Sequence, residues 1–368
     1  MVNNSFNWLL ENAGPIIRYR TSTELLGETS QEVVGSLRKE LLSCSLVQSW
    51  LGNLQPESSI LHGSKSTVFE NSMGKLYEFG LRKGIEALDV KTKPYINWLK
   101  RQVGHPTSNY FYLALVAAFL SMTGYSEDEA IKECVHERLE TVYNFAKRAN
   151  FSEIYVPQDS FHGIPKAFKD KPLLNPSLET EKGSTLPSIH DINAFLHSIY
   201  LMEDTHLRSK VDKIVEFILR PEYQKLYPGY GVVVLSGRFY SAGWSVHLPG
   251  YFPSVDGKAI PYQFAPHPDN PYHPTLLLRL SLMSRSEVAR AHPWFTRMLY
   301  TLERYRIQDG LYSFPRSLLL EKEGYWINGH RLGLEADRRA KKAITCESTF
   351  RYCEITKKIQ VNSFLHED

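Results

Sequence analysis

The fold is indicated by a segment that recurs along the chain, seen most clearly in HPTSNYFYLALVAAFLSM at residues 105–122. Each copy opens with Ser, Thr or Pro, continues as an apolar helix, and precedes a longer helix that is charged on one side. The other copies are IRYRTSTELLG (17–27), VFENSMGKLYEFG (68–80), PSIHDINAFLHSIYLM (187–202), YHPTLLLRLSLMS (272–284) and CESTFRYCEI (346–355). A repeated pair of one apolar and one amphipathic helix is typical of two-layered rings and solenoids.

We predict an all-α fold, an (α/α)6 toroid that uses residues 1–368 as a single domain. The C-terminal copy ends on an apolar helix without a polar helix after it, whereas an open solenoid needs a polar cap. A short helix over residues 5–12 is expected to close the ring against the C-terminal helix. Two segments interrupt the repeat. Residues 151–187 are rich in proline and predict a long loop, and residues 227–274 predict an insertion with a β-hairpin turning at Ser236-Gly237.

The composition excludes several classes of protein. A net charge of +3 on 368 residues, without a dense block of Lys and Arg, argues against a nucleic-acid partner. The longest apolar run, at 110–120, has about half of the ~20 residues that a transmembrane helix needs, so we expect no membrane span. Contact with a membrane surface and the oligomeric state stay open. The N-terminus lacks the pattern of a signal peptide. Four scattered cysteines predict reduced thiols and a cytoplasmic protein: Cys44, Cys134, Cys346 and Cys353.

The segment RMLYTLERYRIQDGLYSFP (297–315) follows the same scheme and ends with Gln308, Gly310 and Tyr312 beyond its helix. Together with the helix pairs it resembles the repeat of the terpenoid cyclase and protein prenyltransferase toroid superfamily. Residues 237–251 and 336–355 are similar to segments of uncharacterised bacterial squalene-cyclase-like proteins. The resemblance covers most of the chain. It implies a toroid whose central cavity holds a small apolar molecule, such as an isoprenoid.

The chain also departs from that superfamily. It lacks the Asp-x-Asp-Asp motif with which class II cyclases protonate their substrates, and its nearest carboxylate pair, Glu203-Asp204, is placed to cap a helix. Protein prenyltransferases bind zinc through Asp, Cys and His, but no spacing here enforces such a set. The activities of these relatives therefore do not transfer directly, and we predict neither a cofactor nor a metal.

A polar stripe on an apolar helix supplies the first candidate site. His190, Asn193 and His197 are spaced i, i+3 and i+7, so they lie on one side of the helix. In a toroid this side faces the cavity, where His190 and His197 would move protons and Asn193 would orient the substrate. Asp191 is a candidate acid at the cavity mouth, or a cap of its helix. The alternative for each is a buried, hydrogen-bonded core residue.

The hairpin segment supplies a second group, made of Tyr240, Trp244 and His247. Their side chains are expected to cover the cavity opening and stack on a ligand, or else to pack the hairpin onto the ring. Three further residues resemble metal ligands in a proline-rich turn, and whether they bind a metal stays open: His267, Asp269 and His273.

Two arginines are unexpected in an apolar helix. Arg18 and Arg20 either bind an anionic group of the substrate or pair with acidic residues such as Glu347 across the ring closure, and the pair is favoured. Arg18 is retained as a candidate substrate-binding residue. Glu347 itself is placed to cap the last apolar helix.

Three functions are compatible with these observations. The first is an enzyme that cyclises, isomerises or eliminates an apolar substrate by acid–base chemistry, with aromatic faces stabilising positive charge. The alternative is a non-catalytic toroid that binds a ligand or peptide. The second alternative is a polysaccharide lyase or hydrolase, which would need paired carboxylates about 5–10 Å apart or a Tyr/His pair. The sequence has no GxSxG, P-loop, dinucleotide or HExxH motif.

Overall fold

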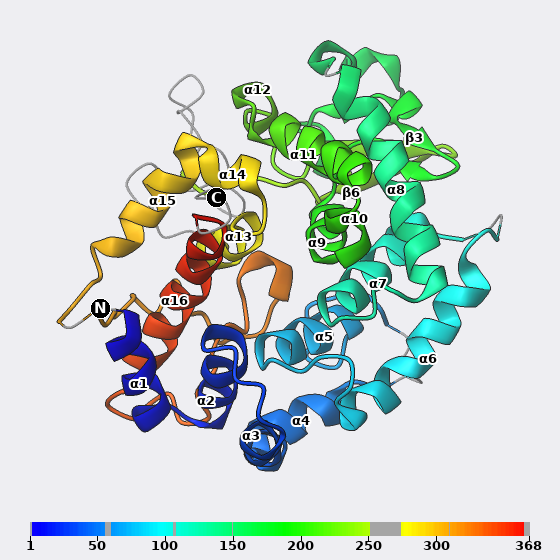
Figure 1. Cartoon of the computed structure of the whole chain (residues 1–368). Helices are drawn as coiled ribbons and strands as arrows, with labels where there is room; N and C mark the ends of the chain where they lie inside the picture. Colours follow the sequence, from blue (N-terminus) through cyan, green and yellow to red (C-terminus); the bar gives the residue numbers. More distant parts are fainter. Residues whose placement is uncertain are drawn as a thin grey trace. The chain divides into compact units, whose positions relative to one another are not determined.

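A computed structural model describes residues 2–55, 60–105, 108–148, 150–250, 274–308 and 310–363 (Figure 1). These residues form sixteen α-helices, several short 3-10 or π turns and six short strands. The predicted predominance of helix is confirmed. The prediction of an all-α fold with one hairpin is too simple, because the six strands form two separate sheets.

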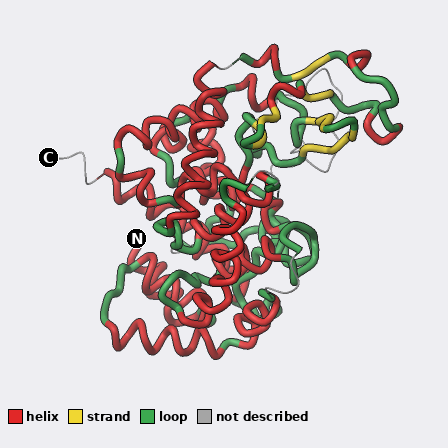
Figure 2. Tube along the Cα trace, turned by 90° about the vertical axis from the view of Figure 1, so that its right-hand side faces the viewer, coloured by secondary structure: helices red, strands yellow, loops and turns green. Residues whose placement is uncertain are grey.

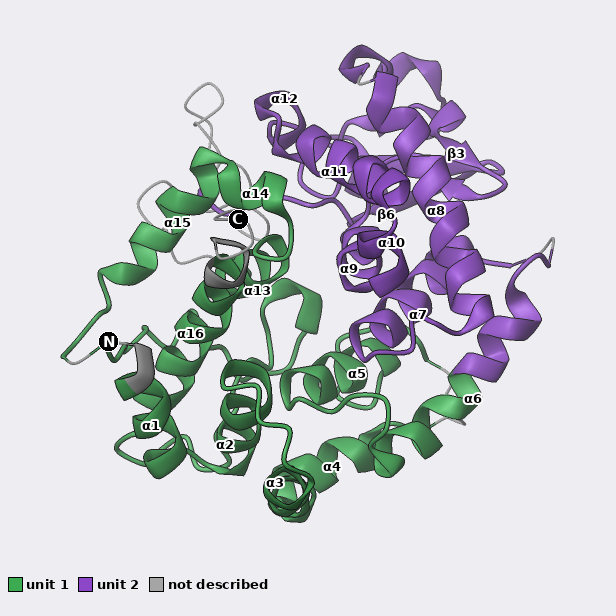
Figure 3. Cartoon of the chain, viewed as in Figure 1, with its two compact units in different colours: residues 1–95, 272–368 green, residues 96–271 purple. Residues whose placement is uncertain are grey.

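The chain divides into two compact units (Figure 3). Unit 1 comprises residues 1–95 and 272–368, and unit 2 comprises residues 96–271. Unit 1 is therefore built from both ends of the chain.

The first part of unit 1 is a series of helices joined by short connections. They are α1 (Val2–Asn12), α2 (Pro15–Arg20), the π-helical turn η1 (Thr21–Leu25), α3 (Gln31–Ser43), α4 (Ser45–Asn53), α5 (Phe69–Glu78) and the start of α6 (Glu86–Gln102). Pro15 opens α2 at a position where its missing N–H is not needed. Helix α5 is buried along its whole length, which agrees with its place among the apolar segments.

The second part of unit 1 returns to the first. It contains α13 (Leu276–Met283), α14 (Glu287–Ala291), α15 (Pro293–Glu303), the 3-10 turn η7 (Trp326–Asn328) and α16 (Ala343–Ser363). Helix α16 packs against α1, α2, η1 and α13. The contact predicted between the N-terminal helix and the C-terminal helix is therefore present. The core of this part includes Trp294 and Phe350, whose side chains are fully buried.

Unit 2 contains the helix pairs that the sequence pattern indicates. They are α7 (Tyr110–Met122) with α8 (Glu129–Arg148), and α9 (Ile189–His197) with α11 (Thr205–Leu219), accompanied by the short α10 (Ile199–Glu203) and α12 (Pro221–Gln224). The apolar helices α7 and α9 pack on each other, and the amphipathic helices α8 and α11 do the same. Each kind of helix thus contacts its own kind, as the two-layered interpretation requires.

Both sheets lie within unit 2, and Figure 2 shows the strands gathered in one region. The larger sheet has the order β1 (Tyr155–Val156), β2 (Leu173–Leu174), β5 (Gly231–Leu235) and β6 (Arg238–Ala242), and the smaller sheet pairs β3 (Glu179–Thr180) with β4 (Gly183–Ser184). The predicted hairpin is confirmed. Ser236 and Gly237 both have positive φ, 49° and 74°, as a two-residue turn of type I′ requires.

The segment 151–187 lacks a long helix, as predicted, but it is not structureless. It contributes β1 to β4 and four 3-10 turns: η3 (Phe151–Glu153), η4 (Gln158–Ser160), η5 (Lys166–Phe168) and η6 (Pro176–Leu178). Strand β2 pairs in parallel with β5, so this segment and the hairpin share one sheet. Gly231 lies at φ 124°, where a side chain would collide with the main-chain oxygen of Pro172 on the neighbouring chain segment.

All four cysteines are free thiols. Within the described ranges, no helix combines the length and apolar character needed to cross a bilayer.

Candidate functional site

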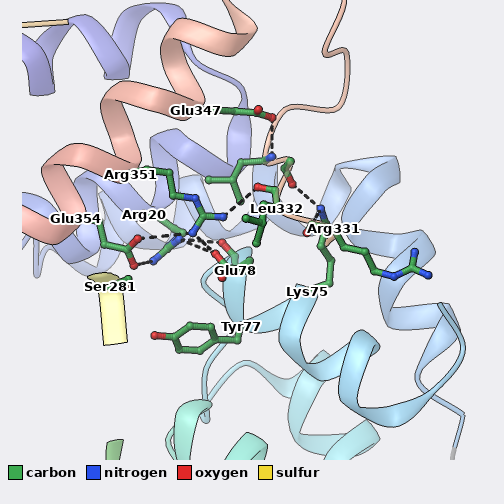
Figure 4. A network of polar contacts seen from close by, with 12 residues as sticks. Arg20, Lys75, Tyr77, Glu78, Ser281, Arg331, Leu332, Glu347, Arg351 and Glu354 are labelled. Carbon is green, nitrogen blue, oxygen red and sulfur yellow. Dashed lines mark hydrogen bonds and ion pairs between the residues drawn. The ribbon is translucent and has the colours of Figure 1, made fainter. Parts of the chain in front are cut away.

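Unit 1 contains an unusual concentration of charged side chains in its interior. We call these residues the charge cluster, and most of the buried ones appear in Figure 4. Its members are joined by ion pairs, hydrogen bonds or short-range electrostatic contacts: Arg20, Glu24, Glu78, Arg82, Arg285, Arg351, Glu354 and Lys358. Charged groups are rarely fully buried unless they are paired or functional.

Local structure explains how these residues meet. Arg351, Glu354 and Lys358 are spaced i, i+3 and i+7 on α16, so they share one side of that helix. Arg20 ends α2, and Glu24 follows on the π-helical turn η1. Helix α16 packs on both segments, which brings the two groups together. π-helical turns are rare and occur frequently at functional sites.

Arg20 is the most buried member of the charge cluster. It is 0% exposed, and its guanidinium binds Glu24 and Glu354, each at 2.6 Å from Nη2. Its Nη1 donates to the main-chain oxygen of Glu78 at 2.9 Å. The guanidinium also lies over the ring of Phe350, 4.5 Å from the ring centroid. Every side of this cation is therefore in contact with the protein.

Arg351 lies beside Arg20, and Figure 4 shows both guanidinium groups between two carboxylates. Arg351 binds Glu78 through a short ion pair, lies 3.7 Å from Glu354, and donates to the main-chain oxygen of Leu332 at 3.0 Å. The two arginines and two glutamates thus form a closed, buried network.

The remaining members are less buried. Arg82 binds Glu24 at 3.1 Å, and its guanidinium lies 4.3 Å from the centroid of the Tyr77 ring. Arg285 contacts the same tyrosine, since its Nη2 donates a hydrogen bond to the Tyr77 hydroxyl at 3.3 Å. Both arginines are half-buried. They form the accessible margin of the charge cluster.

Lys358 differs from the other members in its partners. Lys358 is half-buried, and its Nζ lies 3.4 Å from both the main-chain oxygen and the hydroxyl of Ser281. Among the residues that the structure describes, no carboxylate lies within ion-pair distance of this nitrogen. Within the described part of the chain, the Lys358 amine thus has no close counterion.

The surroundings change the ionisation of several members. Burial opposes the charged form of Glu354, but Arg20, Lys358 and Arg351 together hold the pKa of this carboxyl well below its usual value. Burial likewise opposes the charge on Glu24, and Arg20 and Arg82 bring its pKa below the usual value. For Lys358, burial and the nearby Arg285 lower the pKa to about 7.

Unsatisfied polar atoms collect at this place. Four buried side-chain atoms of the charge cluster and its neighbour on η1 have no hydrogen-bond partner among the described residues: Thr21 Oγ1, Arg285 Nε, Arg351 Nε and Glu354 Oε2. Buried polar groups in folded proteins are nearly always satisfied, so each exception calls for a water, an ion or a ligand. These four are among fourteen such atoms in the described residues, and together with the buried charges they make the charge cluster a candidate functional site.

A second buried network lies along α5 and has a structural role. The Lys75 ammonium binds Glu321 at 2.7 Å and the main-chain oxygens of Arg331 and Gly333 at 2.8 and 2.5 Å. Figure 4 shows Lys75 beside Arg331. All three donors of this lysine are thus used.

The predicted pairing with an acidic residue is confirmed for Arg20, but the partner is not Glu347. Glu347 binds Arg338 at 2.7 Å and accepts from the main-chain nitrogens of Leu334 and Glu335. Arg20 pairs with Glu354 instead, one heptad further along α16. Arg18 instead binds Glu40 at 2.6 Å near the surface. Its predicted role in binding substrate stays a prediction.

In unit 2 the predicted polar stripe has structural partners. Asp191 closes a capping box with Ser188 and binds Arg138 through both carboxylate oxygens, at 2.9 and 3.0 Å. Asn193 donates to the main-chain oxygen of Ile189, and His197 contacts that of Asn193. Asp191 therefore caps its helix and pairs with Arg138, and its role as an acid stays a prediction.

His190 lies in an aromatic group. Its ring is buried and contacts Phe111 edge-on, with the centroids 5.7 Å apart. Trp244 stacks on Phe111, and the centroids of these two rings lie 4.5 Å apart. The structure thus brings together two predicted residues, His190 and Trp244, through a phenylalanine that the sequence did not single out. We call these three residues the aromatic group.

The other residues of the hairpin segment lie apart. His247 contacts the Ser245 hydroxyl at 2.6 Å and the main-chain oxygen of Leu226 at 3.1 Å. Tyr240 is 45% exposed on β6. His267, Asp269 and His273 lie outside the described residues. Within the described ranges, no three His, Cys, Asp or Glu side chains are arranged to hold a metal ion.

No family of known proteins, no curated protein and no solved structure matches this chain. The assignment of function therefore depends on the geometry of the sites themselves.

Proposed function

We propose that the protein is an enzyme that binds an anionic group of its substrate at the charge cluster and moves a proton with Lys358. The observation that carries this proposal is the position of the Lys358 nitrogen. It lies among arginines, contacts only Ser281 at 3.4 Å, and has no carboxylate within ion-pair distance in the part of the chain that the structure describes.

The balance of charge supports an anionic substrate. The charge cluster holds five basic side chains against three glutamates, and its buried centre already pairs Arg20 and Arg351 with Glu78 and Glu354. The excess positive charge is thus on the half-buried margin. A phosphate or carboxylate placed there would supply the missing counter-charge, and guanidinium groups bind both anions in a bidentate manner.

The orphaned atoms support the same conclusion. Arg285 Nε and Thr21 Oγ1 are buried without a hydrogen-bond partner among the described residues, although both can donate. A buried donor that makes no hydrogen bond costs about 1–3 kcal/mol. A ligand with several acceptor oxygens would satisfy them.

Lys358 suits the proton transfer that the sequence assigned to other residues. Cyclisation, isomerisation and elimination each need a proton to be added or removed, and a group with a pKa near the working pH does this best. The pKa of about 7 for Lys358 meets this condition. We therefore propose Lys358, rather than Asp191, as the acid–base group.

The (α/α)6 toroid stays part of the proposal. The like-with-like packing of α7 on α9 and of α8 on α11 supports an arrangement of paired layers within unit 2. The four free cysteines support the proposed cytoplasmic location, where thiols remain reduced.

A second candidate function is the binding of an apolar molecule, such as an isoprenoid, at the aromatic group. Phe111 and Trp244 are half-buried and stacked on each other, and His190 lies edge-on to Phe111. Aromatic faces stabilise positive charge and apolar surfaces alike. Mass spectrometry of small molecules that co-purify with the protein would test this function. An apolar ligand lost in Trp244→Ala supports it, and an equal yield from both proteins contradicts it.

Calorimetric titration with inorganic pyrophosphate tests the main proposal. Wild-type protein is expected to bind pyrophosphate, and Arg285→Gln to bind it at least tenfold more weakly, because a half-buried cation at the margin is lost. Arg304→Gln is the matched control, since Arg304 is an exposed arginine of the same unit that lies over Tyr300. Binding should be tighter at pH 6 than at pH 8.5, since Lys358 is then charged.

Two results would overturn the proposal. One is the absence of pyrophosphate binding to the wild type at pH 6. The other is equal weakening by the substitutions at Arg285 and Arg304, which would indicate attraction by the general surface charge.

A further inference from the structure

We infer that Lys358 is a nucleophile that forms an imine with the carbonyl group of a substrate that also carries a phosphate or carboxylate. The inference rests on the proposed function and narrows its substrate to an anionic aldehyde or ketone. It assigns a covalent step to the same amine, instead of proton transfer alone.

A comparison of the half-buried Lys358 with the buried Lys75, also in unit 1, shows why Lys358 is suited to this step. The Lys75 ammonium is held by one carboxylate and two main-chain oxygens, all within 2.8 Å. Each of its three hydrogens is engaged, so its lone pair is not available. Lys358 has two contacts of 3.4 Å, both to Ser281. An amine with such weak contacts is free to lose its proton and to attack.

The charges around Lys358 favour the neutral amine. Arg285 and Arg20 oppose the ammonium form, whereas Glu354 and Glu24 favour it. Burial and Arg285 outweigh the glutamates, so the pKa falls to about 7 from a usual value of 10.5. About half of the molecules then carry a neutral amine at pH 7, roughly a thousandfold more than for an ordinary lysine. A desolvated lysine beside another cation is a recognised arrangement for imine chemistry.

The neighbours can also serve the steps of the reaction. The neutral Nζ attacks the carbonyl carbon, a C–N bond forms, and the carbonyl oxygen takes up a proton. Loss of water from this adduct then gives the imine, so one amine and one carbonyl yield one imine and one water without any oxidant or reductant. The Ser281 hydroxyl, 3.4 Å from Nζ, is placed to pass the proton. Glu354 remains ionised and would balance the charge of a protonated imine.

The anionic part of the substrate has its own partners. Arg285 and Arg82 are the half-buried arginines at the margin, and Tyr77 contacts both of them. An anion held there would raise the local concentration of the carbonyl compound at Lys358.

Pyridoxal 5′-phosphate followed by sodium borohydride tests the inference, because the aldehyde carries a phosphate and the reagent fixes an imine as a stable amine. Peptide mass spectrometry is expected to find the label chiefly on Lys358. Labelling should rise with pH around a midpoint near 7, and inorganic pyrophosphate should suppress it. Pyridoxal without the phosphate is expected to label Lys358 at least tenfold less.

Glyoxylate in place of pyridoxal phosphate separates the two classes of anion. Efficient borohydride trapping of glyoxylate on Lys358 assigns a carboxylate substrate, and trapping of pyridoxal phosphate alone assigns a phosphate substrate. Either outcome supports the imine.

Two variants control the experiment. Lys358→Arg keeps the positive charge but cannot form an imine, so it should still bind pyrophosphate and lose the label. Lys357→Arg removes the neighbouring lysine on α16 and should keep the label. Equal labelling of Lys358 and the surface lysines would overturn the inference. If the wild type still binds pyrophosphate in that case, the proposed function survives while the covalent step does not.

Discussion

Removing the charge of Glu354 is the most direct test of how the charge cluster is held. In wild-type protein the Glu354 carboxylate binds Arg20 at 2.6 Å and lies 3.7 Å from Arg351. The Glu354→Gln substitution keeps the size of the side chain and leaves these buried cations short of one negative charge.

The expected loss of stability follows from burial. Breaking a buried ion pair costs about 3–5 kcal/mol, because an uncompensated charge is left inside the protein. Arg20 keeps Glu24 at 2.6 Å, and Arg351 keeps Glu78. We therefore expect a loss near the lower limit, about 3 kcal/mol in the free energy of unfolding. For a unit of roughly 150–250 residues this corresponds to a fall in Tm of about 6–12 °C.

An exposed ion pair with the same N–O distance provides the control. Arg18 and Glu40 also lie 2.6 Å apart, but their side chains are 34% and 42% exposed, against 1% and 6% for Arg20 and Glu354. An exposed pair contributes about 0–1 kcal/mol, so Glu40→Gln should lower stability by less than 1 kcal/mol.

Urea unfolding followed by tryptophan fluorescence measures both variants. Four of the six tryptophans, at positions 8, 50, 294 and 326, lie in unit 1, so the signal reports chiefly on that unit. If the two substitutions differ by less than about 1 kcal/mol, the Arg20–Glu354 contact does not behave as a buried ion pair. The argument that the half-buried margin of the charge cluster carries unpaired positive charge would then fail as well.

Three further predictions concern other parts of the chain. Lys358→Met should stabilise the protein most below pH 7, and its gain in stability over wild type should shrink between pH 7 and about 10. In the folded wild type Lys358 releases its proton near pH 7, whereas in the unfolded chain it keeps this proton to higher pH. Unfolding midpoints across this pH range measure the effect. Gly74→Ala should destabilise by about 3 kcal/mol in thermal unfolding, since a Cβ would lie 2.5 Å from the ring of the buried Trp326. Asp191→Asn should cost about 3 kcal/mol in urea unfolding, because it leaves the buried Arg138 without its carboxylate.

Each of these predictions has a matched control. Lys357→Met, at the neighbouring position of α16, is the control for Lys358→Met and is measured over the same pH range. Gly52→Ala places a methyl group on α4 with no atom within 4 Å, so it should be neutral or stabilising by up to about 1 kcal/mol. Asp204→Asn keeps an acceptor at the exposed start of α11 and should change stability by less than about 0.5 kcal/mol. If a control variant changes stability as much as its test variant does, the physical reason given for that prediction is contradicted.

Much of the helical structure could be predicted from the sequence because burial leaves a periodic pattern. The apolar segments at 68–80, 105–122 and 187–202 form α5, α7 and α9, and the turn at Ser236-Gly237 makes the hairpin. Strands β1 to β4 were missed, since two residues are too few to show an alternation. The toroid itself stays a prediction.

The candidate site was found only in part. Arg20 attracted attention as a charge in an apolar helix, but its partner Glu354 lies 334 positions further along the chain, and only the packing of α16 brings them together. A signal was nevertheless present in RYCEITKK, where Arg351, Glu354 and Lys358 repeat with helical spacing at and just beyond the end of the segment 346–355. Charges on the buried side of a helix indicate either a paired network or a site.

The division of unit 1 between the two ends of the chain has a consequence for synthesis. Arg20 leaves the ribosome long before Glu354, and at about 5–20 residues per second the delay is roughly 20–70 seconds. During this interval the N-terminal helices lack the helix that covers them, and the whole of unit 2 is synthesised. The nascent chain therefore carries its most charged interior surface uncovered until the last helix is made, and a truncation before α16 should leave a protein that depends on chaperones.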